Sequence, residues 1–168
     1  RVRSVDGVPT SLCDLGYCDI GLDDNWQSCG AYGEDEFTYH TEAGNPVVNT
    51  TVFPDMVSMT TRAHDLGLTM GWYGNNCICD DHCGGGKDDE EEDEYVKCYQ
   101  GDVDALFSMG YDGIKLDNCG KQRDLELWAE LINATGKAMV IENCHWGRTV
   151  PTTDGYCPWN FYRTSQDV

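Results

Sequence analysis

The stretch GYDGIKLDNCG, residues 110–120, decides how this chain folds. Its apolar run reads as a buried β-strand, but the run is interrupted by Lys115 and ends on Asp117. Burying either charge without a partner is costly. Because the two residues are two positions apart, they face the same side of a strand, where the ammonium keeps the carboxylate ionised. The stretch therefore predicts a core strand that ends in a functional pair of charges.

Four more stretches share this form, an apolar run that ends in polar or aromatic residues. They span residues 17–26, 68–76, 138–146 and 159–167. Continuous apolar runs are typical of strands buried on both faces, as in a parallel sheet. Amphipathic helices are predicted between them, over residues 53–67, 101–110 and 123–136. This alternation predicts an α/β fold in which helices cover a parallel sheet.

Two stretches break the alternation of strands and helices. Residues 30–52 are polar and Gly-rich, and we expect a long loop there, after the first strand. Residues 84–94 form an acidic segment of low complexity. A calcium loop needs ligands at set intervals, whereas this segment is a block of charge, so a solvated insertion is the favoured interpretation.

Composition narrows the class of protein. The net charge is −19, from 11 basic and 30 acidic residues, which argues against nucleic acid and anionic membrane surfaces as partners. No apolar run approaches the length of a membrane span, so membrane insertion is not expected. Ten cysteines, with glycosylation sequons at Asn49 and Asn133, favour disulfides and a secreted, lumenal or cell-surface protein.

The polar residues at the strand ends suggest an active site. Barrel and open α/β enzymes build their sites from such residues at the carboxyl ends of parallel strands. Taken singly, Asp24 or Asp117 could be a helix N-cap, and Lys115 could extend its head group to solvent. Capping does not call for a lysine beside an aspartate, however. A second acid, Asp167, ends a later strand, and two carboxylates across a pocket are what glycoside hydrolysis requires.

Five motifs resemble those of the melibiase-type α-galactosidase family, which includes α-N-acetylgalactosaminidases. They are GLDDNW, HDLGLTMGWY, GIKLDNC, NCHWG and YRTSQD. The resemblance implies a (β/α)8 barrel followed by a β-sandwich, and retaining hydrolysis of terminal α-D-galactosides without a metal or other cofactor. A complete barrel needs roughly 250 residues. Residues 1–168 are therefore expected to be a partial catalytic barrel of about five strands, belonging to a longer protein or a larger assembly.

The resemblance also implies a role for each matching residue. Asp117 would be the nucleophile and Asp167 the general acid/base. The substrate, a galactose-containing oligosaccharide or glycoconjugate, would contact Asp23, Asp24, Tyr73, Lys115 and Arg163. The disulfides implied are Cys144 with Cys157, and Cys119 with Cys77, Cys79 or Cys83.

Three alternatives stay open from the sequence. His145 stands where α-galactosidases of the family carry a glutamate that contacts the sugar's C2 substituent, so an α-N-acetylgalactosaminidase or β-L-arabinopyranosidase is a rival enzyme. A non-catalytic structural or carbohydrate-binding module of an extracellular assembly is the rival from another class. Finally, the cluster CICDDHC, residues 77–83, could bind zinc, although its spacing is not a standard zinc-finger pattern and disulfides are favoured.

Overall fold

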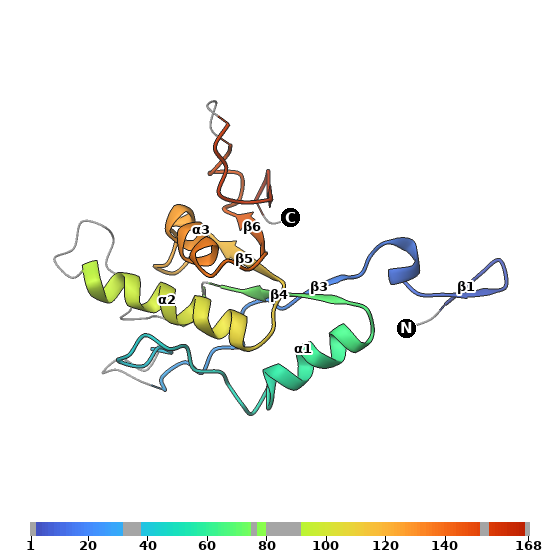
Figure 1. Cartoon of the computed structure of the whole chain (residues 1–168), viewed down its shortest axis with the longest axis horizontal. Coiled ribbons are helices and arrows are strands. Elements are labelled where there is room, and N and C mark those ends of the chain that lie inside the picture. Colours follow the sequence, from blue (N-terminus) through green and yellow to red (C-terminus); the bar gives the residue numbers. More distant parts are fainter. Residues whose placement is uncertain (1–2, 32–37, 75–76, 80–91, 152–154, 167–168) are drawn as a thin grey trace.

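The central feature of the fold is a five-stranded parallel sheet (Figure 1). The computed structural model describes residues 3–31, 38–74, 77–79, 92–151 and 155–166, with the side chains of 92–95 excepted. The strands, in order across the sheet, are β3 (Asp19–Gly21), β4 (Thr69–Tyr73), β5 (Gly113–Asp117), β6 (Val140–Cys144) and β7 (Phe161–Tyr162). Each of the five stretches predicted to be a strand contains one of them.

The order of the strands identifies the architecture. Each strand pairs in parallel with the next strand of the chain, so the order never reverses across the sheet. A doubly wound sheet has a reversal point, whereas a (β/α)8 barrel adds every strand on the same side. The five strands therefore form a sector of such a barrel, which confirms the predicted fold class.

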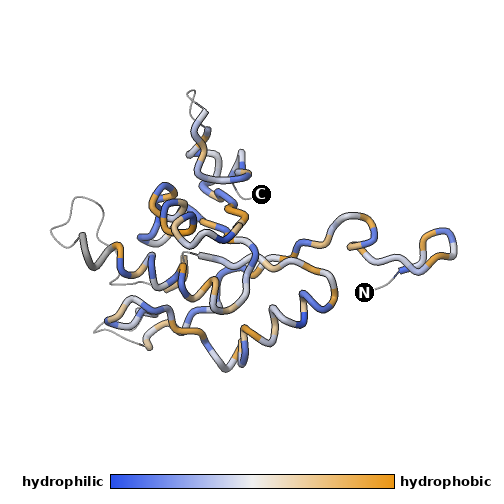
Figure 2. Tube along the Cα trace, in the orientation of Figure 1, coloured by the Kyte–Doolittle hydropathy of each residue, from blue (hydrophilic) through white to orange (hydrophobic). Residues whose placement is uncertain are grey.

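Three helices connect the strands of the sheet. They are α1 (Met56–Asp65), α2 (Glu92–Ser108) and α3 (Leu125–Ala134). Asp55 caps α1 by accepting from the Ser58 backbone N–H, and Asp124 caps α3 in the same way. Hydrophobic and hydrophilic residues alternate along α1, as an amphipathic helix requires (Figure 2).

Helix α2 is longer than the sequence predicted. We expected it over 101–110, but it starts at Glu92, inside the acidic stretch assigned to a solvated insertion. The buried side chains of Cys98 and Tyr99 extend its apolar face toward the N-terminus, and that packing outweighs the local charge. Most of the predicted insertion, residues 84–91, lies outside the described residues.

The loop between β3 and α1 has a buried centre. Tyr39 and His40 are fully buried, and His40 Nε2 lies 3.1 Å from Asp102 Oδ1 on α2. The other carboxylate oxygen of Asp102 accepts from Gln122 Nε2 at 2.6 Å, and the Tyr39 hydroxyl donates to Gln122 Oε1 at 3.2 Å. The described part of this loop is thus held in the fold by a buried network whose polar groups hydrogen-bond to one another.

An N-terminal hairpin was missed from the sequence. Strands β1 (Arg3–Val5) and β2 (Val8–Thr10) pair antiparallel and extend away from the sheet (Figure 1). Asp6 and Gly7 between them have φ values of 51° and 80°. Asp-Gly is a strong signal for the two-residue turn that needs positive φ at both positions, so the signal was present in the sequence.

The contact between α2 and the buried loop gives a stability test. A Cβ atom at Gly101 would overlap the backbone carbonyl of Gly44, which cannot move like a side-chain end. Overpacking costs about 1–3 kcal/mol, and better helix propensity returns only about 1 kcal/mol. Gly101→Ala should therefore lower the free energy of unfolding in urea. The matched control is Gly21→Ala on β3, where a Cβ meets nothing within 4 Å, and an equal loss there would contradict the packing argument.

Candidate active site

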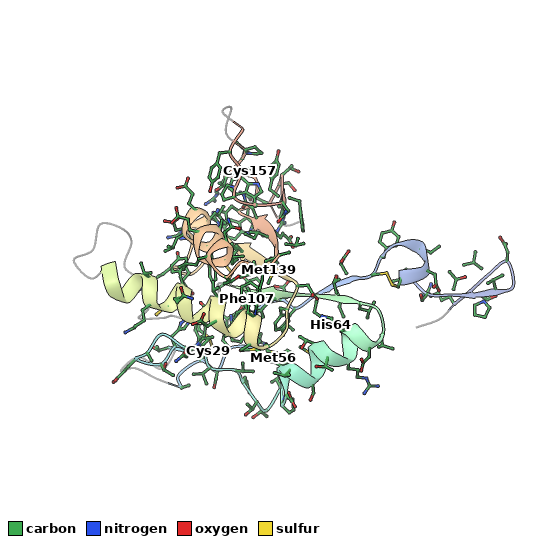
Figure 3. The ribbon with its side chains drawn as sticks, in the orientation of Figure 1. Cys29, Met56, His64, Phe107, Met139 and Cys157 are labelled. Atoms are coloured by element: carbon green, nitrogen blue, oxygen red, sulfur yellow. A yellow bond between two sulfur atoms is a disulfide. The ribbon has the colours of Figure 1, made fainter. Side chains whose placement is uncertain are left out.

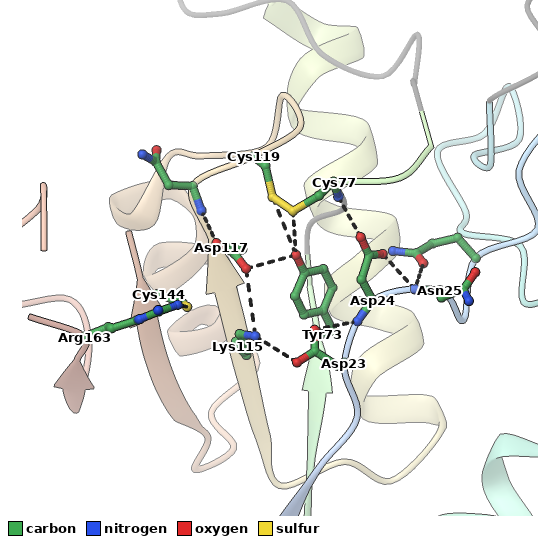
Figure 4. Close-up of a disulfide and its surroundings, with 12 residues drawn as sticks. Asp23, Asp24, Asn25, Tyr73, Cys77, Lys115, Asp117, Cys119, Cys144 and Arg163 are labelled. Carbon is green, nitrogen blue, oxygen red and sulfur yellow. Dashed lines mark hydrogen bonds and ion pairs between the residues drawn. A yellow bond between two sulfur atoms is a disulfide. The ribbon is translucent and has the colours of Figure 1, made fainter. Parts of the chain in front are cut away.

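The carboxyl ends of β4 and β5, with the residues that follow β3, gather five of the predicted site residues (Figure 4). In the parallel register, Tyr73 lies opposite Lys115, and Asp117 follows two positions later on the same face. The five residues are Asp23, Asp24, Tyr73, Lys115 and Asp117. The alternate positions of these strands, such as Trp72 and Leu116, are buried in the core, so the sheet separates core from site.

Lys115 is held between two carboxylates. Its Nζ lies 3.0 Å from Asp23 Oδ2 and 3.8 Å from Asp117 Oδ2, and 5.1 Å from the centre of the Tyr73 ring. Burial alone would lower the pKa of Lys115, but the hydrogen bond and attraction of Asp23, together with nearby groups such as Asp117, outweigh burial and raise that pKa. Lys115 therefore stays charged, which explains how a core strand accommodates it.

Asp117 is buried and oriented through both carboxylate oxygens. Oδ1 accepts from the backbone N–H of Asn118 at 2.8 Å, and Oδ2 accepts from the Tyr73 hydroxyl at 3.2 Å. Burial, followed by the charge of Asp117, raises the pKa of Tyr73 well above its ordinary value. Tyr73 is therefore a permanent donor to this carboxylate, and it fixes the position of the oxygen beside Lys115.

The two aspartates after β3 have different partners. Asp23 contacts Lys115, and although burial acts to raise its pKa, the Asp24 backbone N–H and Lys115 lower it. Asp24 Oδ2 accepts from the Cys77 backbone N–H at 2.8 Å, while Oδ1 accepts from Asn25 N at 2.8 Å. Asn25 has a φ of 86°, a strained conformation for a residue with a side chain. Asp24 thus stabilises the turn that delivers Asp23 to the site.

Trp26 belongs to the core. It follows β3 and could have been a sugar-stacking platform, but it is fully buried. Its Nε1 donates to the Tyr73 backbone carbonyl at 2.9 Å, and its ring centre lies 4.7 Å from that of Trp72. Trp26 therefore ties the end of β4 to the turn after β3.

A disulfide lies directly beside the Tyr73 hydroxyl. Cys77 and Cys119 are bonded, which is one of the three pairings left open by the sequence, and the hydroxyl lies 3.0 Å from Cys77 Sγ (Figure 4). Cys79 is bonded to Cys29 instead, so it is not the partner of Cys119. Cys83 and His82 lie outside the described residues. Cys77 and Cys79 are two of the four residues proposed as alternative zinc ligands, and in this oxidised chain their sulfurs are in disulfides and cannot bind zinc.

Two further disulfides account for other cysteines. Cys13 is bonded to Cys18, a pairing for which the sequence gave no indication, and Cys98 on α2 is also in a disulfide.

The predicted pairing of Cys144 with Cys157 is wrong, because both are free thiols. Cys144 is buried at the end of β6, where Arg163 Nη1 donates to its Sγ at 3.6 Å. Cys157 is exposed in the C-terminal segment and donates to the Trp159 carbonyl (Figure 3). Pairing of β6 with β7 brings Arg163, and not Cys157, to the Cys144 thiol. Burial raises the pKa of that thiol, so it is neutral.

His145 is buried just beyond the end of β6. Its Nδ1 lies 2.9 Å from the Thr149 hydroxyl, and its backbone N–H donates to Asn143 Oδ1 at 3.0 Å. Burial lowers the pKa of the imidazole, so the ring is neutral at neutral pH. The described part of the chain forms an open concave cavity of about 720 Å³, which is lined by Asp23 and Lys115 but not by Tyr73, Asp117 or His145.

The structure gives partial information on three further predicted residues, Asp167 and the two sequon asparagines. Asp167, the predicted acid/base, lies outside the described residues, so its spacing from Asp117 stays a prediction. The sequon residues differ in exposure: Asn133 is exposed near the end of α3, whereas Asn49 is half-buried and accepts from the Thr51 backbone N–H.

The structure adds a site residue that the sequence analysis missed. Glu142 on β6 lies opposite Lys115 on one side and Phe161 on the other, and it lines the cavity. Burial raises the pKa of Glu142, as do Asp23 and Asp117, while Lys115 and Arg163 oppose this. The signal was available, because Glu142 interrupts an apolar strand as Lys115 does.

Glycoside hydrolases resemble this chain both in sequence and in structure. An α-galactosidase of Oryza sativa subsp. japonica is 30% identical over 169 residues, which cover 96% of this chain and 36% of that protein. Alpha-galactosidase 3 of Arabidopsis thaliana is 26% identical, over 96% of this chain and 34% of that protein. The chain thus spans about a third of the length of these curated relatives. No family model matches the chain.

Among solved structures, a GH27 β-L-arabinopyranosidase of Geobacillus stearothermophilus in complex with arabinose matches with a TM-score of 0.61. The match covers 94% of this chain and 47% of that one, at 13% identity. The fold is therefore that of part of the barrel seen in such glycoside hydrolases. Within that fold class, the chain is a relative of the melibiase-type α-galactosidases, as its motifs predicted.

The raised pKa of Glu142 gives a testable dependence of stability on pH. A carboxyl group whose pKa is raised on folding stabilises the fold when protonated, and its ionisation costs stability as pH rises from the unfolded pKa through the folded one. Glu142→Gln should therefore raise the melting temperature at neutral pH, with a gain that disappears below the ordinary pKa of glutamate.

Glu130→Gln, on the exposed side of α3, is the matched control and should show no such dependence. A melting temperature of Glu142→Gln that is unchanged at neutral pH would contradict the assignment of Glu142 as a desolvated acid.

Proposed function

We propose that residues 1–168 form part of the (β/α)8 catalytic barrel of a retaining glycoside hydrolase that acts on terminal α-D-galactosides. The observation that carries the proposal is the position of Asp117. It is buried at the carboxyl end of β5, oriented by Tyr73 and accompanied by Lys115. The sequence relatives named α-galactosidases support galactose as the proposed sugar.

The mechanism would proceed in two displacements. Asp117 attacks the anomeric carbon, and the glycosidic bond breaks as Asp167 donates a proton to the leaving oxygen. Water then attacks the same carbon, with Asp167 taking its proton, and the bond to Asp117 breaks. Tyr73 and Lys115 would stabilise the Asp117 carboxylate when it departs, because both contact Oδ2.

The other residues at the strand ends would bind the sugar. Asp23 is exposed toward solvent and can exchange part of its contact with Lys115 for hydroxyl groups of the substrate. Asp24 supports Asp23 through the turn, and Arg163, beside Cys144, would hold the substrate near the acid/base. No metal or other cofactor is assigned a step in this mechanism.

The setting of the protein is proposed to be outside the cell, in the lumen of an organelle or on the cell surface. Three disulfides with both partners described support an oxidising compartment. The substrate would be a galactose-containing oligosaccharide or glycoconjugate, and Asn49 and Asn133 are proposed carriers of N-linked glycans. None of the described helices has the length and apolarity needed to cross a membrane.

Asp117→Asn should abolish hydrolysis of an α-galactoside, with a loss of several orders of magnitude in kcat, because the amide cannot form the covalent intermediate. A 2-deoxy-2-fluoro galactosyl donor should label the wild-type full chain once, and peptide mass spectrometry should find the sugar on Asp117.

Asp104→Asn on α2 is the matched control, since this exposed acid contacts Gln100 and lies away from the site. Full activity of Asp117→Asn, or a label on another carboxylate, would overturn the assignment of the nucleophile. An inactive, correctly folded wild-type chain would favour the non-catalytic module instead.

The family resemblance implies that His145, which is buried just beyond β6, borders the sugar's C2 substituent, so its bulk should determine the choice of sugar. A neutral imidazole can accept a hydrogen bond from a 2-hydroxyl, but its ring leaves less room for a 2-acetamido group. We expect the wild type to cleave a chromogenic α-galactoside and not the matching N-acetylgalactosaminide. His145→Glu should keep or raise the galactosidase activity. Faster cleavage of the N-acetyl substrate by the wild type would show that His145 does not restrict this position.

A further inference from the structure

The disulfide between Cys77 and Cys119 lies unusually close to the proposed nucleophile. Tyr73 joins them, since its hydroxyl lies 3.0 Å from Cys77 Sγ, 3.6 Å from Cys119 Sγ and 3.2 Å from Asp117 Oδ2 (Figure 4). One ligand atom from each of Cys77, Cys119 and Asp117 lies within 4.8 Å of the others. Thiolates and carboxylate oxygens are ligands that Zn²⁺ takes in proteins, but in this structure the two sulfurs are bonded to each other.

We propose that, when this disulfide is reduced, Cys77, Cys119 and Asp117 form a binding site for a thiophilic divalent cation such as Zn²⁺. In the oxidised chain the sulfurs are bonded to each other and cannot serve as thiolate ligands. The site is thus latent, and a change of redox state creates it.

The geometry suits a tetrahedral ion. Zinc–sulfur bonds of about 2.3 Å place two sulfur ligands roughly 3.8 Å apart, so the sulfurs must separate after reduction. The Cα atoms of Cys77 and Cys119 are 5.0 Å apart, which permits that separation by side-chain rotation. Asp117 would supply the third ligand, and water or the Tyr73 hydroxyl the fourth.

The backbone on both sides of the site is held independently of the disulfide. Cys77 N donates to Asp24 Oδ2 at 2.8 Å, and Cys119 lies two residues after Asp117, which ends β5. Cys77 is exposed, so a reductant and an ion can reach the sulfurs from solvent. Two thiolates would add negative charge beside Asp117, and a divalent ion cancels that added charge.

The redox step balances with a phosphine as reductant. Tris(2-carboxyethyl)phosphine breaks the S–S bond and becomes the phosphine oxide, while water supplies the oxygen and the two thiol protons. Binding of the ion then releases both thiol protons. The bound ion would occupy the Asp117 carboxylate, so reduction with metal would block the residue proposed to attack the sugar.

Co²⁺ provides a test that needs no enzymatic activity. After treatment with the phosphine, the full chain should bind one Co²⁺ at this site and show thiolate-to-cobalt charge-transfer absorption, which added Zn²⁺ abolishes. The untreated chain should show none. Near-ultraviolet circular dichroism should remain native after reduction, and its loss would overturn the proposal, because the site needs the folded frame.

Variants separate this site from the other cysteines. Cys77→Ser combined with Cys119→Ser should remove the cobalt signal, whereas Cys13→Ser combined with Cys18→Ser, the matched control, should keep it. Asp117→Asn, which leaves all sulfurs in place, should weaken Co²⁺ binding by at least about tenfold. A full signal in the first variant, or unchanged affinity in Asp117→Asn, would overturn the proposal. Neither outcome depends on whether the chain hydrolyses a galactoside.

Discussion

The structure depends on the ion pairs of Lys115 with Asp23 and Asp117. A lysine in a core strand is stable only if its charge is compensated, and the compensation comes from two different segments of the chain. Asp117 lies on the same strand, but Asp23 follows β3, two strands away across the sheet. The contact therefore forms only when β3, β4 and β5 stand in parallel register with their carboxyl ends together, as they do in a barrel.

Groups outside the site maintain that register at the strand ends. Trp26 donates from the turn after β3 to the last residue of β4, and the Cys77–Cys119 disulfide joins the segment after β4 to the segment after β5. Asp24, in the turn after β3, accepts from Cys77 N and so connects that turn to the segment after β4. The ends of β3, β4 and β5 are thus joined by the Trp26 hydrogen bond and the disulfide, neither of which uses the side chains of Asp23, Lys115 or Asp117, so those side chains stay available to a substrate.

Sequence reasoning succeeded where a local pattern is repeated and failed where partners meet only in space. Apolar runs ending in polar residues located all five strands, and the motifs named side chains that the structure brings together around Asp117, whose role as an active site stays a proposal. Periodicity could not extend α2 to Glu92, because the apolar face there depends on the packing of Cys98 and Tyr99. The pairing of Cys144 with Cys157 failed because cysteine spacing carries no information on which side chain the next strand brings alongside.

Glu142 shows how the charged side chains around the cavity can coexist. Among the described residues, the carboxylates of Asp23 and Asp117 raise the pKa of Glu142, and the cations Lys115 and Arg163 lower it. Asp23 accepts a hydrogen bond from the Asp24 backbone N–H, which with Lys115 lowers its pKa. Burial instead raises the pKa of Glu142 above its ordinary value. Protonation of Glu142 would leave Lys115 to the other two acids, and a carboxylate three strands away from Asp23 across the sheet would thereby help to keep the proposed nucleophile paired.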